Sequence, residues 1–354
     1  MSLYSISREN LFVLLRNLAE DYSVFVPVKK GENRFYKNYS DISSLLEKTA
    51  NGKGIKLVVG EVRAFEPLKL FFLRARERVA VGFRDESPSS RQKPYCIVGA
   101  KACDLKGFKI QDKVFISEDY RDPFYIEQRE DNLVISADCT SAIDTCFCLS
   151  LHGDPFPKEN FDINLSEINA GFVVESGSER GESFITRNAS LFHKPGASLI
   201  AERDAQRKRV ADGVRENITK HGIPDQDEFS GIIEKNYDAP LWKEEAEECV
   251  ECGACNAICP TCHCFLLYDQ QSEENLVRLR LWDSCMIKDF AKVAGGANPR
   301  PNLWMRLRNR FEKKFDFFPK VNDIYACTGC GRCISACPAK IDIRRVLKRL
   351  VENV

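Results

Sequence analysis

The chain has 354 residues, of which 44% are hydrophobic and 29% charged, so it has enough apolar material for more than one packed domain. Its 52 basic and 52 acidic side chains cancel, which argues against long-range attraction to nucleic acid or to an anionic membrane surface. No apolar run approaches the roughly 18 residues of a membrane span, and the opening MSLYSISREN carries no apolar signal segment. We therefore expect a cytoplasmic protein that binds no nucleic acid and does not insert into a membrane.

Sixteen cysteines are unusual for a chain of this size. In a reducing compartment, grouped cysteines indicate metal binding more often than disulfides. They occur as Cys96, Cys103, Cys139, Cys146 and Cys148, then six from Cys249 to Cys264, then Cys285, and finally four from Cys327 to Cys337. The stretch between Cys148 and Cys249 has none. Metal binding is therefore the leading expectation.

Residues 1–195 predict a mixed α/β domain. An apolar stripe at helical spacing follows Ser7, a residue type that caps helices, and consists of Leu11, Leu14, Leu15 and Leu18. The run YSVFVPV and short β-branched or alternating runs at 55–59, 95–98, 133–135 and 172–175 predict strands.

Residues 196–240 predict a helical connector, because 196–220 is rich in Ala, Glu and Arg and free of proline. Residues 241–354 predict a mostly α-helical domain, in which Pro240 suits a helix start. The closing segment KIDIRRVLKRLVENV predicts an amphipathic helix with its apolar residues on one face.

Four cysteines of the α/β domain are candidates for one site. Cys103 follows one predicted strand, and Cys139, Cys146 and Cys148 form a C-x6-C-x-C pattern after another. Four thiolates suit one iron–sulfur cluster, and strand-to-helix loops of an α/β domain can bring such residues together. The alternatives are that Asp104 or Asp138 replaces a thiolate, or that these cysteines are buried core residues. Cys96 is interpreted as core.

Two cysteine runs are more specific, because 249–260 and 327–338 both read C-x2-C-x2-C-x3-C-P. In ferredoxins with two such runs, three cysteines bind one 4Fe-4S cluster and the fourth binds the other cluster. This exchange predicts one cluster on Cys249, Cys252, Cys255 and Cys337. It predicts a second on Cys327, Cys330, Cys333 and Cys259. Residues 241–354 would then be a ferredoxin-like domain with a long insert between its two motifs.

Glycines within the runs fit this interpretation. Gly253, Gly329 and Gly331 lie where the backbone approaches a cluster and can need a positive φ. The alternative is a pair of zinc knuckles, which also use C-x2-C pairs. Zinc has no use for eight cysteines in two such repeats, so we favour iron–sulfur clusters.

The insert between the runs contains three more cysteines, Cys262 and Cys264 in TCHCF and Cys285 in WDSCM. They can form a further metal site, with His263 as a nitrogen ligand, or pack as polarizable filler. The basic run RLRNRFEKKF at 306–315 can dock an acidic partner such as ferredoxin. Alternatively it is the solvated face of a helix, with Leu307, Phe311 and Phe315 facing inward.

Motifs of other chemistries are missing from the sequence. It has no G-x-G-x-x-G after a strand and no Walker A loop, so no flavin or nucleotide site is indicated in this chain. No Ser/His/Asp or Cys/His arrangement indicates a nucleophile, and we assign no catalytic residue.

Taken together, CxxCGACNAICPTCHCF, WDSCM, FAKVAGGANPR, RLRNRFEKKF and CTGCGRCISACPAKIDI resemble the family of dicluster iron–sulfur subunits that anaerobic sulfite reductases share with the cytoplasmic sulfhydrogenases, where they form the beta subunit. GAKACDLKGF and CTSAIDTCFCL extend the resemblance over nearly the whole chain. It implies an electron-transfer subunit of a cytoplasmic anaerobic complex. Its partners would be a flavin- and NAD(P)-binding subunit and a catalytic redox subunit, such as a hydrogenase or sulfite reductase.

Two other functions stay open from the sequence. One of the unusual cysteine groups could bind a substrate directly, which would make the chain part of a catalytic site. The clusters could instead sense oxygen or iron, although the sequence shows no DNA-binding element.

Overall fold

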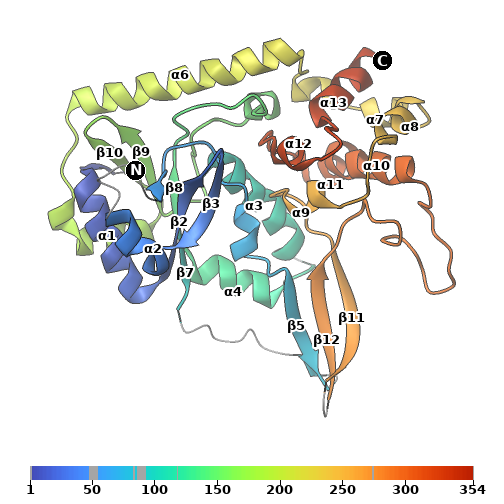
Figure 1. The fold of residues 1–354 in the computed structure, drawn as a ribbon, viewed down its shortest axis with the longest axis horizontal. Coiled ribbons are helices and arrows are strands. Elements are labelled where there is room, and N and C mark those ends of the chain that lie inside the picture. The colour runs from blue at the N-terminus through green and yellow to red at the C-terminus, as the bar shows by residue number, and fades with distance from the viewer. Residues whose placement is uncertain are drawn as a thin grey trace.

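The N-terminal part is organised around one mixed β-sheet. The computed structural model describes residues 2–47, 55–82, 84–85, 93–117, 119–272 and 275–353. Within them the sheet has the order β1-β10-β9-β8-β7-β2-β3, with β4 paired to β2 (Figure 1). Its strands are β1 (Leu3–Ile6), β2 (Ser23–Lys30), β3 (Asn33–Asn38), β4 (Lys56–Leu57), β7 (Tyr95–Ala100), β8 (Leu133–Ala137), β9 (Ile163–Ile168) and β10 (Gly171–Ser176). The predicted α/β class of this part is confirmed.

The centre of the sheet positions two of the candidate cysteines. The pairs β2–β7, β7–β8 and β8–β9 are parallel, and β8 is buried along its whole length, as expected for a strand covered on both faces. The chain continues from the carboxyl ends of β7 and β8 to Cys103 and Cys139. Because β7 and β8 are neighbours, both cysteines lie at one edge of the sheet, where open α/β sheets form their ligand sites.

Helices cover the sheet, and the first begins where the sequence predicts. Ser7 caps α1 (Arg8–Asp21) by accepting a hydrogen bond from the Asn10 amide at 3.1 Å, and the predicted leucine stripe is buried. The other helices of this part are α2 (Tyr39–Glu47), α3 (Ala102–Phe115), α4 (Pro123–Asp131) and α5 (Glu179–Arg187). Short 3-10 turns are η2 (Leu68–Phe71), η3 (Cys148–Leu151) and η4 (Ala189–Leu191).

A single long helix, α6 (Ala197–His221), confirms the predicted charged helix and runs along one side of the molecule from the N-terminal sheet to the C-terminal helices (Figure 1). It holds the loop that carries the C-x6-C-x-C cysteines, because Asn217 donates to the carbonyl of Ile143 at 2.7 Å. Lys220 pairs with Asp144 of the same loop at 2.7 Å. The predicted domain boundaries at 195 and 240 stay predictions.

The C-terminal part consists of short helices around a second apolar core. They are η5 (Gln226–Phe229), α7 (Ile232–Lys235), α8 (Leu241–Ala246), α9 (Ala254–Ala257), α10 (Leu303–Glu312), the π-helical turn η6 (Lys313–Phe317), α11 (Phe318–Asn322), α12 (Arg332–Ala336) and α13 (Ile343–Glu352). The predicted closing helix is α13, although the last residue of the predicted segment, Val354, lies outside the described residues. Among the helices described, none is long and apolar enough to cross a membrane.

The expectation of a mostly α-helical C-terminal part is met only in part. The insert forms a hairpin, β11 (Phe265–Ser272) and β12 (Asn275–Trp282), which projects from the rest of the molecule (Figure 1). β12 pairs with β5 (Arg76–Val81), which is followed by β6 (Arg84–Asp85), so the second sheet has the order β11-β12-β5-β6. In β12, Val277 and Leu279 are buried and Arg278 between them is exposed, which is the alternation of a half-buried strand. A strand from the N-terminal half therefore completes the insert.

Candidate metal centres

The first predicted set of ligands surrounds one cavity. Cys249, Cys252, Cys255 and Cys337 all line it, and apolar walls come from residues such as Met286, Leu307 and Ile341. Gly253, with φ of +70°, starts the short helix α9 that carries Cys255. Cys252 is the exposed member of the set. The exchange of the fourth cysteine between the two runs, which predicts Cys337 here, agrees with this cavity.

The second predicted set consists of neighbouring thiols beside the first. Burial raises the pKa of the Cys327 thiol to about 12, against an opposing effect of Lys314, and the charges of Cys333 and Cys259 add to the rise. Burial likewise raises the pKa of Cys333, and the charges of Cys330 and Cys259 raise it further. Cys333 also lines the cavity of the first set. The two sets therefore lie next to each other.

The four N-terminal candidates come together in a third group. Cys103, Cys139, Cys146 and Cys148 line one cavity, which also has Val210 and Val214 of α6 in its wall. Burial raises the pKa of Cys139 to about 11, although the buried ammonium of Lys101 opposes this. A fifth cysteine, Cys330 of the second run, lines the same cavity. The sequence does not reveal this role of Cys330, because no spacing rule relates it to residues near 140.

Two glycines explain how the second run reaches the N-terminal group. A Cβ on Gly329 would lie 2.5 Å from the Cα of Cys148, and one on Gly331 would lie 2.0 Å from the carbonyl oxygen of Thr145. Both glycines have positive φ, +64° and +69°. The amide of Phe147 donates to the carbonyl of Gly329 at 2.9 Å. These glycines thus permit the approach of two backbone segments, as well as the loop conformation that the sequence indicates.

Two arginines, Arg332 and Arg63, also connect the second cysteine run to the N-terminal part of the chain. Arg332 forms a buried ion pair with Asp104, the residue after Cys103, at 2.8 Å. Arg63 donates to the carbonyl of Cys330 and, at 3.2 Å each, to the hydroxyls of Thr145 and Ser335. Asp104 is therefore engaged by an arginine, which argues against its replacing a thiolate as a metal ligand.

The basic run at 306–315 is neither a docking surface nor a solvated helix face. Arg306, Arg308, Arg310 and Lys314 are all buried, while Leu307, Phe311 and Phe315 face inward as expected. The Lys314 ammonium lies 3.4 Å from the Cys259 sulfur, and the Lys313 ammonium lies 3.6 Å from the Cys264 sulfur. The π-helical turn η6 presents these two lysines to different cysteines.

Buried cations without carboxylate partners support the presence of an anionic group among the cysteines. Within the described residues, Lys69, Arg310 and Lys314 are buried and form no ion pair with a carboxylate, and the Arg310 Nε and one terminal nitrogen have no hydrogen-bond partner. Burial lowers the pKa of Arg310 more than any other single effect. The charges of the nearby Cys255 and Cys333 raise it, and together the surrounding cysteines hold the pKa above its usual value. Thiolate-bound iron–sulfur clusters carry the negative charge that such a setting requires. The donors and charges present therefore fit these clusters.

Of the remaining cysteines, Cys262 and Cys285 lie near the amide of Asn256, whereas Cys264 lies near the Lys313 ammonium. The amide nitrogen of Asn256 lies 3.2 Å from the Cys285 sulfur and 3.5 Å from the Cys262 sulfur, and Asn256 is itself buried. The ring of His263 lies near Phe115 and Phe318, and its Nδ1 bonds to the carbonyl of Thr261 at 3.1 Å. Metal binding by the three cysteines stays a prediction.

The cysteine groups are too open for a single tetrahedral ion. With Zn–S bonds of about 2.3 Å, the ligands of such an ion lie about 3.8 Å apart. Across the described ranges, no three cysteine sulfurs lie within 4.8 Å of one another; the group that meets this limit is His152, Asp225 and Asp227, on the surface. A four-iron cube spreads its thiolates more widely because each binds a different iron. The zinc alternative is therefore disfavoured.

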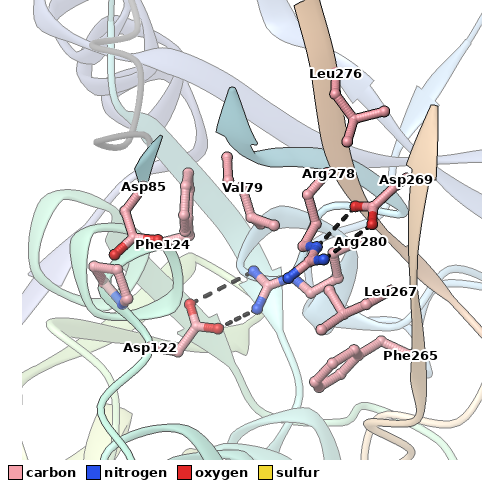
Figure 2. A pocket seen from close by; sticks show the side chains of 12 residues that line it. Val79, Asp85, Asp122, Phe124, Phe265, Leu267, Asp269, Leu276, Arg278 and Arg280 are labelled. Carbon is pink, nitrogen blue, oxygen red and sulfur yellow. Dashed lines mark hydrogen bonds and ion pairs between the residues drawn. The ribbon is translucent and has the colours of Figure 1, made fainter. Parts of the chain in front are cut away.

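A cavity of about 450 Å³ beside the hairpin is separate from the cysteines. Figure 2 shows Arg280 directed at Asp122 and Arg278 paired with Asp269, with Phe265 and Leu267 on the strand β11 side. These four charged side chains of the lining therefore already pair with one another. None of the predicted site residues lies in it.

Comparisons with known proteins agree with the geometry. A family model described as a 4Fe-4S dicluster domain matches residues 248–341, the segment with both cysteine runs and the insert. Sulfhydrogenase 2 subunit beta of Pyrococcus furiosus is 30% identical over 339 residues, which cover 95% of this chain and 95% of that protein. Pyruvate-flavodoxin oxidoreductase of Trichormus variabilis is 26% identical over 101 residues, 28% of this chain and 6% of that protein. The iron–sulfur character is confirmed, while the number of clusters stays a prediction.

Proposed function

The chain belongs to the family of sulfhydrogenase beta subunits, and on that premise we propose that it is the iron–sulfur electron-transfer subunit of a multi-subunit oxidoreductase. It relays electrons between a flavin- and NAD(P)-binding subunit and a catalytic redox subunit, such as a hydrogenase or a sulfite reductase. Ferredoxin is a further candidate partner. The complex works in an anaerobic cytoplasm, and this chain itself makes or breaks no substrate bond.

Three cysteine sets hold the clusters in this proposal. Cys249, Cys252, Cys255 and Cys337 bind the first 4Fe-4S cluster, and Cys327, Cys330, Cys333 and Cys259 bind the second. Cys103, Cys139, Cys146 and Cys148 bind a third iron–sulfur cluster. Each cluster, when bound, supplies a one-electron redox couple.

The observation that carries the relay is the order of the three sets. Cys333 of the second set lines the cavity of the first, and Cys330 of the second set lines the cavity of the third. The second set therefore lies between the other two. A row of redox groups of this kind suits a protein that passes electrons through its interior.

The chain's own residues keep water from the sets and leave one end accessible. Met286, Leu307 and Ile341 wall the first cavity with apolar atoms, which lowers the local dielectric around a bound cluster. Cys252 is exposed at the same cavity. This end of the row is therefore where electrons can enter or leave.

Iron and acid-labile sulfide analysis of anaerobically purified protein tests the ligand sets. Three clusters of four irons each give about twelve irons per chain, and two give about eight. Cys139→Ser should remove about four irons and one EPR signal, whereas Cys96→Ser, at a buried strand position, should remove none. Fewer than about eight irons in properly reconstituted protein would rule out the two-cluster assignment.

Isolation of the intact complex from its native host tests the partners. We expect a flavin-containing subunit and a catalytic redox subunit to co-purify with this chain in fixed proportion. A chain that is isolated alone, and that no electron donor reduces, would contradict the relay.

A second candidate function is supported by one cavity. About 170 Å³ of space lined by Cys103, Cys148, Lys106 and His152 gives an approach to the third set. A small substrate could meet a cluster there, which would make the chain part of a catalytic site. Changes in the spectrum of the third cluster when small anions are added would support this function, and an unchanged spectrum would exclude it.

A further inference from the structure

Arg310 is the one arginine of the basic run that faces the cysteines. α10 buries Leu307 and Phe311 in the C-terminal core, and Arg310, which is 4% exposed, lines the cavity of the first cysteine set. That cavity also contains Cys333 of the second set. The guanidinium thus lies where the two sets adjoin.

The charge of Arg310 is unpaired, unlike that of its helix neighbours. Arg306 pairs with Glu251 at 2.8 Å, and Arg308 lies 3.6 Å from Glu312. Arg310 forms no such pair with any described carboxylate, and its Nε and one terminal nitrogen have no hydrogen-bond partner. Buried donors of this kind are rare unless a ligand is there to accept from them. A bound cluster has sulfur atoms that accept such bonds.

The charged neighbours of Arg310 belong to both predicted clusters. Its guanidinium lies near Cys255 of the first set, near Cys333 and Cys259 of the second, and near Cys262, which belongs to neither set. It also hydrogen-bonds to Cys333. Lys314 differs, since its neighbours are Cys259, Cys262 and Cys327, and none belongs to the first set. One helical segment thus carries a shared cation and a cation for the second set alone.

We infer that Arg310 is a positioning residue that donates hydrogen bonds to the first cluster and places a positive charge between the first and second clusters, raising the reduction potentials of both. This inference rests on the proposed function. A cluster gains one negative charge on reduction, so a nearby cation and N–H···S bonds favour the reduced state. Lys314 acts in the same way on the second cluster only.

Redox titrations of the full chain, followed by EPR under anaerobic conditions, test the inference. Arg310→Met should lower the midpoint potentials of the first and second clusters by about 59 mV or more each. This shift corresponds to a tenfold change in the equilibrium constant of a one-electron reduction. Lys314→Met should lower only the second. Arg278→Met, at an exposed arginine of β12 that pairs with Asp269 on the hairpin surface, should leave both unchanged.

Arg310→Lys separates charge from hydrogen bonding and keeps the test decisive if the methionine variant loses its clusters. The lysine keeps the positive charge but lacks the planar guanidinium and its several donors. The potential of the first cluster, which accepts those hydrogen bonds in the inference, should therefore fall more than that of the second. Wild-type potentials in Arg310→Lys, or in an Arg310→Met protein with its full iron content, would overturn the inference and leave the proposed function intact. A wild-type protein with fewer than about eight irons would instead overturn the proposed function.

Discussion

Gly331 lies where the backbones of the two halves of the chain approach each other closely. Gly331→Ala adds a methyl group 2.0 Å from the Thr145 carbonyl oxygen at a φ of +69°. The left-handed conformation costs an L-residue roughly 1–2 kcal/mol, and the overlap adds about 1–3 kcal/mol. We expect loss of stability and of the iron bound by the third cysteine set, as measured by denaturant unfolding and iron analysis.

Gly231→Ala is the matched control for that variant. Gly231 has a similar φ of +73°, but a Cβ there would meet nothing within 4 Å. The Gly231→Ala variant should therefore lose only the free energy of unfolding that the left-handed conformation costs, and it should keep its full iron content. If both alanine variants bind as much iron as the wild type, the close approach of the two segments is not needed for the third site.

Cys96 should make the protein sensitive to alkali. It lies between Val24 of β2 and Leu133 of β8, and burial raises the pKa of its thiol above the usual 9.0. Above that value the unfolded thiol ionises while the folded one stays neutral, so the free energy of unfolding falls as pH rises. The loss approaches about 1.4 kcal/mol per pH unit.

Cys96→Val removes this group at a similar volume. Its denaturation midpoint should fall less than that of the wild type between about pH 8 and about pH 10, because other thiols titrate alike in both proteins. Val24→Ala, which weakens the same packing without removing the thiol, should keep the wild-type pH dependence. Equal pH dependence of wild type and Cys96→Val would contradict the prediction.

Much of the candidate site can be predicted from the sequence alone. The contacts that bring its distant segments together cannot be predicted in this way. The spacing of Cys249 to Cys259 and of Cys327 to Cys337 identifies the motif, because loop geometry around a cluster is local. The place of Cys330 beside the N-terminal cysteines depends on contacts between distant segments. The burial of Arg310 is also hidden, since a charged residue in a basic run is ordinarily solvated.

At the scale of elements, a buried arginine reinforces the β12–β5 pairing that ties the hairpin β11–β12 to the N-terminal half. Arg280 of β12 pairs with Glu77 of β5 and with Asp122 at the start of α4. Burial raises the pKa of Glu77, and Arg280 opposes this rise. The strand partner β5 lies some two hundred residues away in the sequence, which is why the fold of the insert could not be predicted from local patterns.

Arg280→Met should loosen this sheet without unfolding the rest. Glu77 loses its buried partner, and breaking such a pair costs about 3 kcal/mol or more. Hydrogen exchange followed by mass spectrometry should show faster exchange in β5, β11 and β12, with α1 unchanged. Arg278→Met removes an exposed pair on the same strand and should show little change. Equal exchange in both variants would contradict the role of Arg280.

At the scale of the whole molecule, the ion pair of Arg332 with Asp104 joins the two halves in the interior. Both side chains are almost completely buried, and Asp104 also accepts from the Leu68 amide at 3.2 Å. Asp104→Asn leaves a buried guanidinium without its counter-charge, which should cost about 3–5 kcal/mol. Denaturant unfolding followed by tryptophan fluorescence and by cluster absorbance measures this loss.

An exposed pair provides the comparison. Asp269→Asn breaks the ion pair with Arg278 on the hairpin surface and should cost less than about 1 kcal/mol. If Asp104→Asn costs no more than this control, the buried pair does not contribute to joining the halves. The α/β class was foreseeable from strand patterns, whereas this union was not, because sequence patterns within each half say nothing of how the halves meet.

The cavity shared by Cys103 and Cys330 also sets a limit on biogenesis. A ribosome delivers the first of these thiols long before the second, so the pocket is complete only after residue 330 has been synthesised. In the proposed function, loading of a cluster into the complete pocket therefore follows the synthesis of residue 330. A chain truncated before residue 330 would leave the N-terminal thiols without this wall of the pocket and so more open to oxidation.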